Sequence, residues 1–178
     1  MIEATISALQ KHGVAGTSFT EVLRDSGAAR GAIYHHFPGG KLELVAQATE
    51  LNGRQVRERL AVLPADSPSA VVAGFFELVR PVVEASSAGG GCAVAAATVD
   101  TALEPGEQDL RRIADCAFSA WAETLTERLT TSGLEADRAR DLATTLIVLL
   151  EGAHVLCRAS RNLEPFERAA RTARSLVG

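Results

Sequence analysis

The sequence predicts an all-α protein of about nine helices. Aromatic residues make up only 4% of the 178 residues. Alanine and leucine are abundant, whereas strands draw on aromatic and β-branched residues. Apolar residues recur at helical spacing, and glycine or proline clusters separate these stretches. No segment shows a convincing two-residue period of a strand.

Two short helices are expected at the front of the chain. The first covers residues 1–12 and closes at Gly13, because glycine readily adopts the left-handed conformation that ends a helix. Ser18, followed three residues later by Glu21, is a capping box that starts the second helix. Gly27 ends that helix, so a tight turn follows it.

A third helix, over residues 29–36, is expected to have one buried and one exposed face. Ile33 and Phe37 lie four residues apart and anchor it against the second helix. In a helix-turn-helix, such a helix enters the major groove of DNA while the helix before it crosses the backbone. The candidate DNA contacts are Ser18, Arg30, Gly31, Ala32, Tyr34, His35, His36 and Lys41.

Each of these residue types has a chemical reason to meet DNA. Arg30 suits a guanine edge or a phosphate, whereas Tyr34 and Lys41 suit phosphates. The alternative without a DNA-binding role is that residues 18–41 form only a helical hairpin with a solvated face. Metal binding by the two adjacent histidines is disfavoured, because neighbouring helical residues point about 100° apart. Residues 1–45 hold four bases and four acids, so the formal charge of −4 belongs to residues 46–178. DNA binding therefore has to rest on a few placed contacts and on dimerisation.

The remaining helices are expected at residues 41–63, 69–87, 92–103, 107–131, 135–161 and 165–176, with a turn at Glu104-Pro105-Gly106. The helix over residues 135–161 is the most apolar of them.

The segment Gly27-Ala-Ala-Arg-Gly-Ala-Ile-Tyr-His-His-Phe-Pro-Gly-Gly-Lys41 resembles the DNA-binding domain of the TetR family of bacterial repressors. Its second half is similar to the LmrA/YxaF-like branch in particular. Looser similarity to that branch continues at residues 91–94, at Phe118 with Trp121, and at residues 151–153. Two features depart from the family pattern: alanines stand in the turn before the third helix, and no basic arm precedes the first helix.

The resemblance implies a helix-turn-helix domain at residues 1–45 and a ligand-binding and dimerisation domain at residues 46–178. It implies a repressor that leaves a palindromic operator when a small apolar or aromatic ligand binds. Such pockets are mostly apolar with a few polar groups, although each candidate below, taken singly, suits an ordinary core better than a pocket. The candidate pocket residues are Phe75, Phe76, Val79, Thr98, Phe118, Trp121, Leu125, Leu146, Leu150 and His154.

The last two helices are the expected dimer interface, since helices in this position pair with their symmetry mates in the family. The candidate interface residues are Leu142, Leu149, Gly152 and Ala153. Two recognition helices about one DNA turn apart read a palindrome, which is why a homodimer is expected.

Other classes of protein fit the sequence less well. Three cysteines without paired spacing argue against a zinc site or a disulfide framework, and no cofactor is expected. A cytoplasmic protein without a membrane span is expected, because no signal peptide and no run of about 18 apolar residues is seen. The sequence shows no nucleophile–base pair, no paired carboxylates and no phosphate loop, so nothing in it indicates an enzyme. The main alternative is a helical ligand-sensing module that does not bind DNA.

Overall fold

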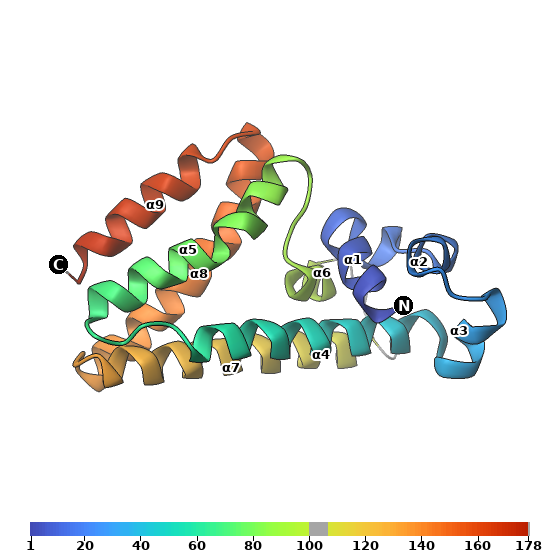
Figure 1. The fold of residues 1–178 in the computed structure, drawn as a ribbon, viewed down its shortest axis with the longest axis horizontal. Helices are drawn as coiled ribbons and strands as arrows, with labels where there is room; N and C mark the ends of the chain where they lie inside the picture. Colours follow the sequence, from blue (N-terminus) through green and yellow to red (C-terminus); the bar gives the residue numbers. More distant parts are fainter. Residues whose placement is uncertain (100–106, 178) are drawn as a thin grey trace. The chain divides into compact units, whose positions relative to one another are not determined.

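The computed structural model describes residues 1–99 and 107–177, without the side chains of Arg30, Ala32, Tyr34 and Glu107. The described residues form nine α-helices and no strand, which confirms the predicted class (Figure 1). The helices are α1 (Ile2–Gly16), α2 (Phe19–Ser26), α3 (Arg30–His36), α4 (Gly40–Ala61), α5 (Pro68–Ser87), α6 (Ala93–Val99), α7 (Glu107–Thr131), α8 (Ala136–Ser160) and α9 (Glu164–Ser175). The expected turn at Glu104-Pro105-Gly106 and the end of the helix expected at residues 92–103 lie outside the described residues.

Most helix ends follow local chemistry. Ser67 caps α5 by accepting a hydrogen bond from the backbone N–H of Ala70 at 3.1 Å, and Pro68 occupies the first turn, where it needs no N–H partner. The carboxylate of Glu135 caps α8 by accepting from two backbone N–H groups. Gly13 has a φ of 67°, so it interrupts α1 where the sequence predicts an end, and one further turn follows it.

The chain divides into two compact units. One comprises residues 1–54 and 91–117, and the other comprises residues 55–90 and 118–178. Both α4 and α7 begin in the first unit and end in the second, so neither unit is a continuous stretch. The domain boundary expected after residue 45 stays a prediction.

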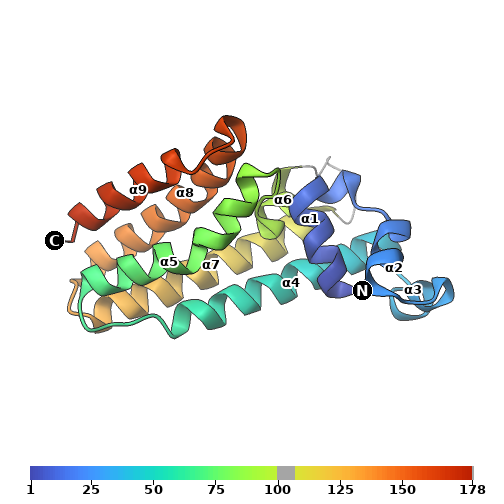
Figure 2. The ribbon, with the colours of Figure 1, turned by 45° about the horizontal axis from the view of Figure 1, so that its top comes forward.

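In the first unit, α1 packs against α2 and α6, and α2 packs against α3. In the second unit, α5, α8 and α9 pack on one another, as Figure 2 shows. The core of this second unit includes a chain of aromatic rings: Phe76 lies 5.4 Å from Phe75 and 5.6 Å from Phe166 between ring centroids. Phe166 therefore joins α9 to α5.

Among the described residues, one helix, α8, has the length and apolar composition that a membrane span requires. A core helix of a soluble protein meets the same two criteria. One face of α8 is buried against α5 and α9, which accounts for much of its apolar content.

Candidate DNA-binding interface

The turn between α2 and α3 is built as the sequence predicts. Ser18 Oγ accepts a hydrogen bond from the backbone N–H of Glu21 at 3.2 Å, which satisfies one of the open donors at the start of α2. Gly27 ends α2 with φ 67° and ψ 12°, a conformation that costs glycine little and other residues more. The chain is thereby redirected into α3 after two alanines.

A small apolar cluster fixes α3 on its neighbours. Val22, Ile33, Phe37 and Leu44 are buried together, and the side chains of the first helices pack around them. Ile33 and Phe37 thus face inward as predicted. The opposite face of α3 is held outward by this packing, since residues on one side of a short helix cannot all reach the core.

The described part of that outer face is open to solvent. His35 and His36 are exposed, with ring centroids 5.3 Å apart. Gly31 is exposed, and apart from its chain neighbours and the backbone of α3 no described atom lies within 4 Å of the position that a Cβ would take there, so the backbone itself is accessible. Ser18 is exposed as well, at the start of α2. The side chains of the remaining three predicted contacts on α3 lie outside the described atoms.

Lys41 has a structural partner that the sequence did not reveal. Its ammonium group donates to the backbone carbonyl of Ala15 at 3.1 Å, which ties the start of α4 to the end of α1. An ammonium group carries three donors, so two remain for a phosphate. Glu43 completes the start of α4, because its carboxylate accepts from the backbone N–H of Gly39 at 2.7 Å.

A network of charged side chains on α1 and α2 was also missed from the sequence. The Nε2 atom of His12 lies 3.2 Å from a carboxylate oxygen of Glu21 and so joins α1 to α2. Arg24 donates to Asp25 at 2.7 Å, and this hydrogen bond lowers the pKa of the Asp25 carboxyl. These contacts join residues up to nine positions apart, and only the ones within a helical turn could have been found from spacing.

Comparison with known proteins places this geometry in a family. Residues 1–48 match the model of the tetR family of bacterial regulatory proteins. Residues 68–172 match the model of the C-terminal domain of LmrA/YxaF-like transcriptional regulators. The chain belongs to the TetR family, in its LmrA/YxaF-like branch. It is therefore a DNA-binding transcriptional regulator.

Known transcriptional regulators match nearly the whole chain. An uncharacterized HTH-type transcriptional regulator of Mycobacterium tuberculosis is 29% identical over 99% of this chain and 92% of its own length. A TetR regulator from Legionella pneumophila has the same fold, with a TM-score of 0.84, 19% identity and coverage of 99% and 95% of the two chains. The TetR-family regulator CifR, solved as a cysteine mutant with 26-base-pair double-stranded operator DNA, matches with a TM-score of 0.67, 22% identity and coverage of 96% and 93%.

Nine of the ten predicted pocket residues of this TetR-family chain lie in the second unit. Eight of the nine are buried, and Phe118 is half-buried with its ring 5.2 Å from that of Trp121 in an edge-to-face arrangement. Thr98 belongs to the first unit, where it is exposed and donates to the carbonyl of Ala95. The role of this set as a ligand pocket stays a prediction.

His154 is the one imidazole in the interior of the C-terminal region among the described residues. Its Nδ1 atom lies 2.6 Å from Ser86 Oγ, and that hydroxyl also donates to the Val82 carbonyl. Burial, and the nearby positive charge of Arg158, lower the pKa of His154 from 6.5 to about 4. The imidazole is therefore neutral at neutral pH and joins α8 to α5.

We expect this buried imidazole to make the fold sensitive to acid. In the unfolded chain His154 binds a proton near pH 6.5, whereas in the folded chain it does so near pH 4. Its contribution to the free energy of unfolding is thus complete above pH 6.5 and falls by up to about 3 kcal/mol as the pH drops to 4. Urea unfolding between pH 7 and pH 4 should show a steeper loss for the native chain than for His154→Gln. Equal slopes in the two proteins would contradict this assignment.

The predicted dimer residues differ in how far they are buried, and their role in an interface stays a prediction. Leu142 and Ala153 are buried within their own chain, whereas Leu149 and Gly152 are half-buried. The helix α8 also carries three exposed apolar side chains that were not among the predicted interface residues. Together with Gly152 they form what we term the α8 stripe. It consists of Val148, Gly152, Val155 and Leu156. Apart from its chain neighbours and the backbone of α8 itself, no described atom lies within 4 Å of a Cβ built on Gly152, so the middle of the α8 stripe is open.

Proposed function

We propose that this regulator is a ligand-responsive repressor that acts as a homodimer on a palindromic operator. The observation that carries the proposal is α3, which is anchored by a buried cluster while its opposite face is exposed. A recognition helix needs this combination, because the groove must accept the helix without disturbing its packing. A protein that binds operator DNA works in the cytoplasm, beside the chromosome.

The predicted contacts divide by role. Lys41 and Tyr34 hold phosphates, which set the position of the helix on the duplex. Arg30 reads a base edge, and the exposed backbone at Gly31 allows close approach to the groove. The structure of CifR with its operator supports a DNA-bound state for this fold.

Two substitutions should separate these roles. Lys41→Ala should weaken binding to operator and to unrelated DNA alike and reduce the slope of log K against log salt by about 1. Arg30→Ala should in addition relax sequence preference, at a cost of about 1–3 kcal/mol on the operator. Fluorescence anisotropy with labelled duplexes at several salt concentrations measures both. An Arg30→Ala protein with unchanged affinity and preference would refute the role of Arg30.

The α8 stripe supports the homodimer. Its members recur at intervals of three and four residues, so they share one side of the helix. Three exposed aliphatic side chains around an open glycine are unfavourable in water and suit close packing against a second helix. The stripe of a second copy provides that helix under two-fold symmetry.

The effector is a small apolar or aromatic molecule that binds among the buried aromatic residues of the second unit. Trp121 is the best single candidate, since its large ring can stack on a planar ligand. Binding shifts the population toward a conformer whose recognition helices no longer match successive grooves, and α4, which passes from one unit to the other, carries the change. Such a shift requires the ligand to bind the two conformers unequally.

Binding of the purified chain to its own upstream DNA tests the proposal. We expect a sequence-selective, salt-sensitive complex with two protomers on each operator. A protein that binds planar apolar compounds without binding any DNA would instead be a ligand-sensing module. Trp121 fluorescence tests whether an effector binds. We expect saturable quenching by a planar aromatic compound, together with release of the operator. A panel of such compounds that leaves both signals unchanged would remove the effector from the proposal.

A further inference from the structure

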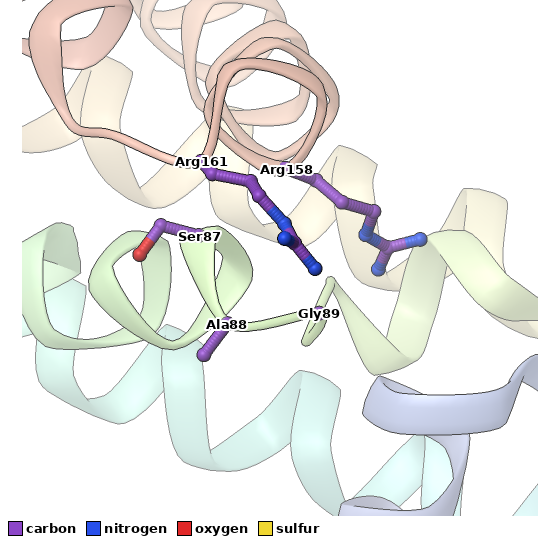
Figure 3. Close-up of a pocket in the computed structure, with 5 residues that line it drawn as sticks. All are labelled: Ser87, Ala88, Gly89, Arg158 and Arg161. Atoms are coloured by element: carbon purple, nitrogen blue, oxygen red, sulfur yellow. The ribbon is translucent and has the colours of Figure 1, made fainter.

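A pocket of about 330 Å³ lies where α5 and α8 end, within the second unit (Figure 3). It is lined by Ser87, Ala88, Gly89, Arg158 and Arg161. Figure 3 shows the side chains of both arginines extending from the end of α8 toward the turn at Gly89. Its lining therefore carries two positive charges and no negative one.

Among the described residues, neither of the two arginines has an acidic partner, unlike Arg80 and Arg174 of the same unit. Arg80 pairs with Glu167, and Arg174 pairs with Glu77. Within the described chain, Arg158 donates only to the carbonyl of Gly90, with Nε at 3.0 Å and with one Nη. A guanidinium group has five N–H donors, so three remain on Arg158.

Arg161 has a backbone conformation that side chains rarely adopt. Its φ of 55° and ψ of 32° place it in the left-handed region, which ends α8 and where glycine or asparagine is more common. Its side chain is exposed, and no hydrogen bond or ion pair of this guanidinium occurs among the described residues. The local conformation thus directs an uncommitted cation to the pocket.

The backbone of the turn does not explain the two charges. The N–H groups of Ala88, Gly89 and Gly90 already bond to carbonyls at the end of α5. The hydrogen bond to the Gly90 carbonyl explains in part why a cation stands at Arg158, near a helix C-terminus. It does not explain the second cation at Arg161. Two guanidinium groups that face one hollow repel each other, and an anion between them removes that repulsion.

We propose that this pocket binds a small molecule through an oxyanion, either a carboxylate or a phosphate, held between Arg158 and Arg161. Guanidinium groups bind both oxyanions in a bidentate manner. The volume is at the lower end of the range for small-molecule pockets and exceeds the space that one inorganic ion needs, so the anion is one group of a larger compound. The site does not depend on the effector pocket proposed above. Gly90 is the last residue of this segment of the second unit, and the chain enters the first unit at Gly91.

Titration of the ¹⁵N-labelled full chain with sodium phosphate, and separately with sodium acetate, tests the proposal. Sodium chloride at equal ionic strength serves as the salt control. We expect saturable shifts of the Gly89 and Gly90 amide signals and of the arginine Nε–H signals. A response to phosphate alone assigns a phosphate group, and a response to acetate alone assigns a carboxylate. Shifts with neither probe beyond those with chloride would overturn the site.

Three variants locate the binding. Arg161→Gln removes one charge without breaking any hydrogen bond or ion pair of the described residues, so it should fold normally and weaken binding of the responding anion by about tenfold or more. Arg158→Gln should have a similar effect. Arg171→Gln, on the exposed side of α9, changes the net charge equally and should leave the affinity unchanged. If Arg161→Gln binds as tightly as Arg171→Gln, the anion is not held here.

Discussion

Val155→Glu is expected to convert the homodimer into a monomer that no longer holds its operator. Val155 is 66% exposed in the single chain and lies in the α8 stripe. In a two-fold interface the same residue enters from both partners, so the substitution places two carboxylates in one apolar contact. Burying unpaired charges in this way costs several kcal/mol, and each 1.4 kcal/mol of lost binding free energy lowers the affinity between the protomers tenfold. Without the second recognition helix, operator affinity should fall by about 100-fold or more.

Light scattering after size exclusion gives the mass of this variant, and anisotropy gives its operator affinity. Val62→Glu is a matched control, since Val62 is 79% exposed, follows the end of α4 and is not a member of the α8 stripe. It introduces the same charge and should remain dimeric and bind DNA. A Val155→Glu protein that stays dimeric at micromolar concentration would place the interface elsewhere.

The front of the chain could be predicted from sequence because its signals are local. Gly27 ends α2 because glycine readily adopts a positive φ. Ser18 caps that helix by accepting a hydrogen bond from the backbone N–H of Glu21, only three residues away. The inward direction of Ile33 and Phe37 follows from a spacing of four. None of these interactions depends on a distant part of the chain.

The two faces of α8 could not be assigned in the same way. Leu142 and Ala153 suited an interface by residue type, yet they are buried against their own chain, whereas Val148 and Val155 are exposed. A helix that is apolar on two sides has no single hydrophobic direction, so periodicity cannot tell which side meets the same chain. Tertiary packing of α5 and α9 decides it.

Long-range polar contacts escaped the sequence for a related reason. Ser86 and His154 are separated by 68 positions, and no spacing rule joins them. The same separation joins Arg158 to Gly90, which is why the pocket at the end of α8 could not be expected. Folding alone brings such pairs together, whereas helix caps are encoded within one turn.

Phe37→Ala should loosen the recognition helix and remove operator binding while the dimer persists. Phe37 is buried with Val22, Ile33 and Leu44, and it forms the C-terminal anchor of α3. Truncating a buried phenylalanine costs about 3–5 kcal/mol, which is a large fraction of the stability of a small unit. Without this anchor, the outer face of α3 is no longer held in one orientation. We expect faster amide hydrogen exchange in α2 and α3 and a loss of operator affinity of about 100-fold or more.

His36→Ala separates packing from contact at the neighbouring position. His36 is exposed, so its truncation should change the free energy of unfolding by no more than about 0.5 kcal/mol and leave hydrogen exchange in α2 unchanged. The His36→Ala substitution should reduce operator affinity only by the free energy of the contact that the His36 side chain makes with DNA. The α8 stripe lies in the other unit, so both variants should remain dimeric. A Phe37→Ala protein with native exchange rates and native operator affinity would mean that this cluster does not position α3, and the recognition helix would then need another support.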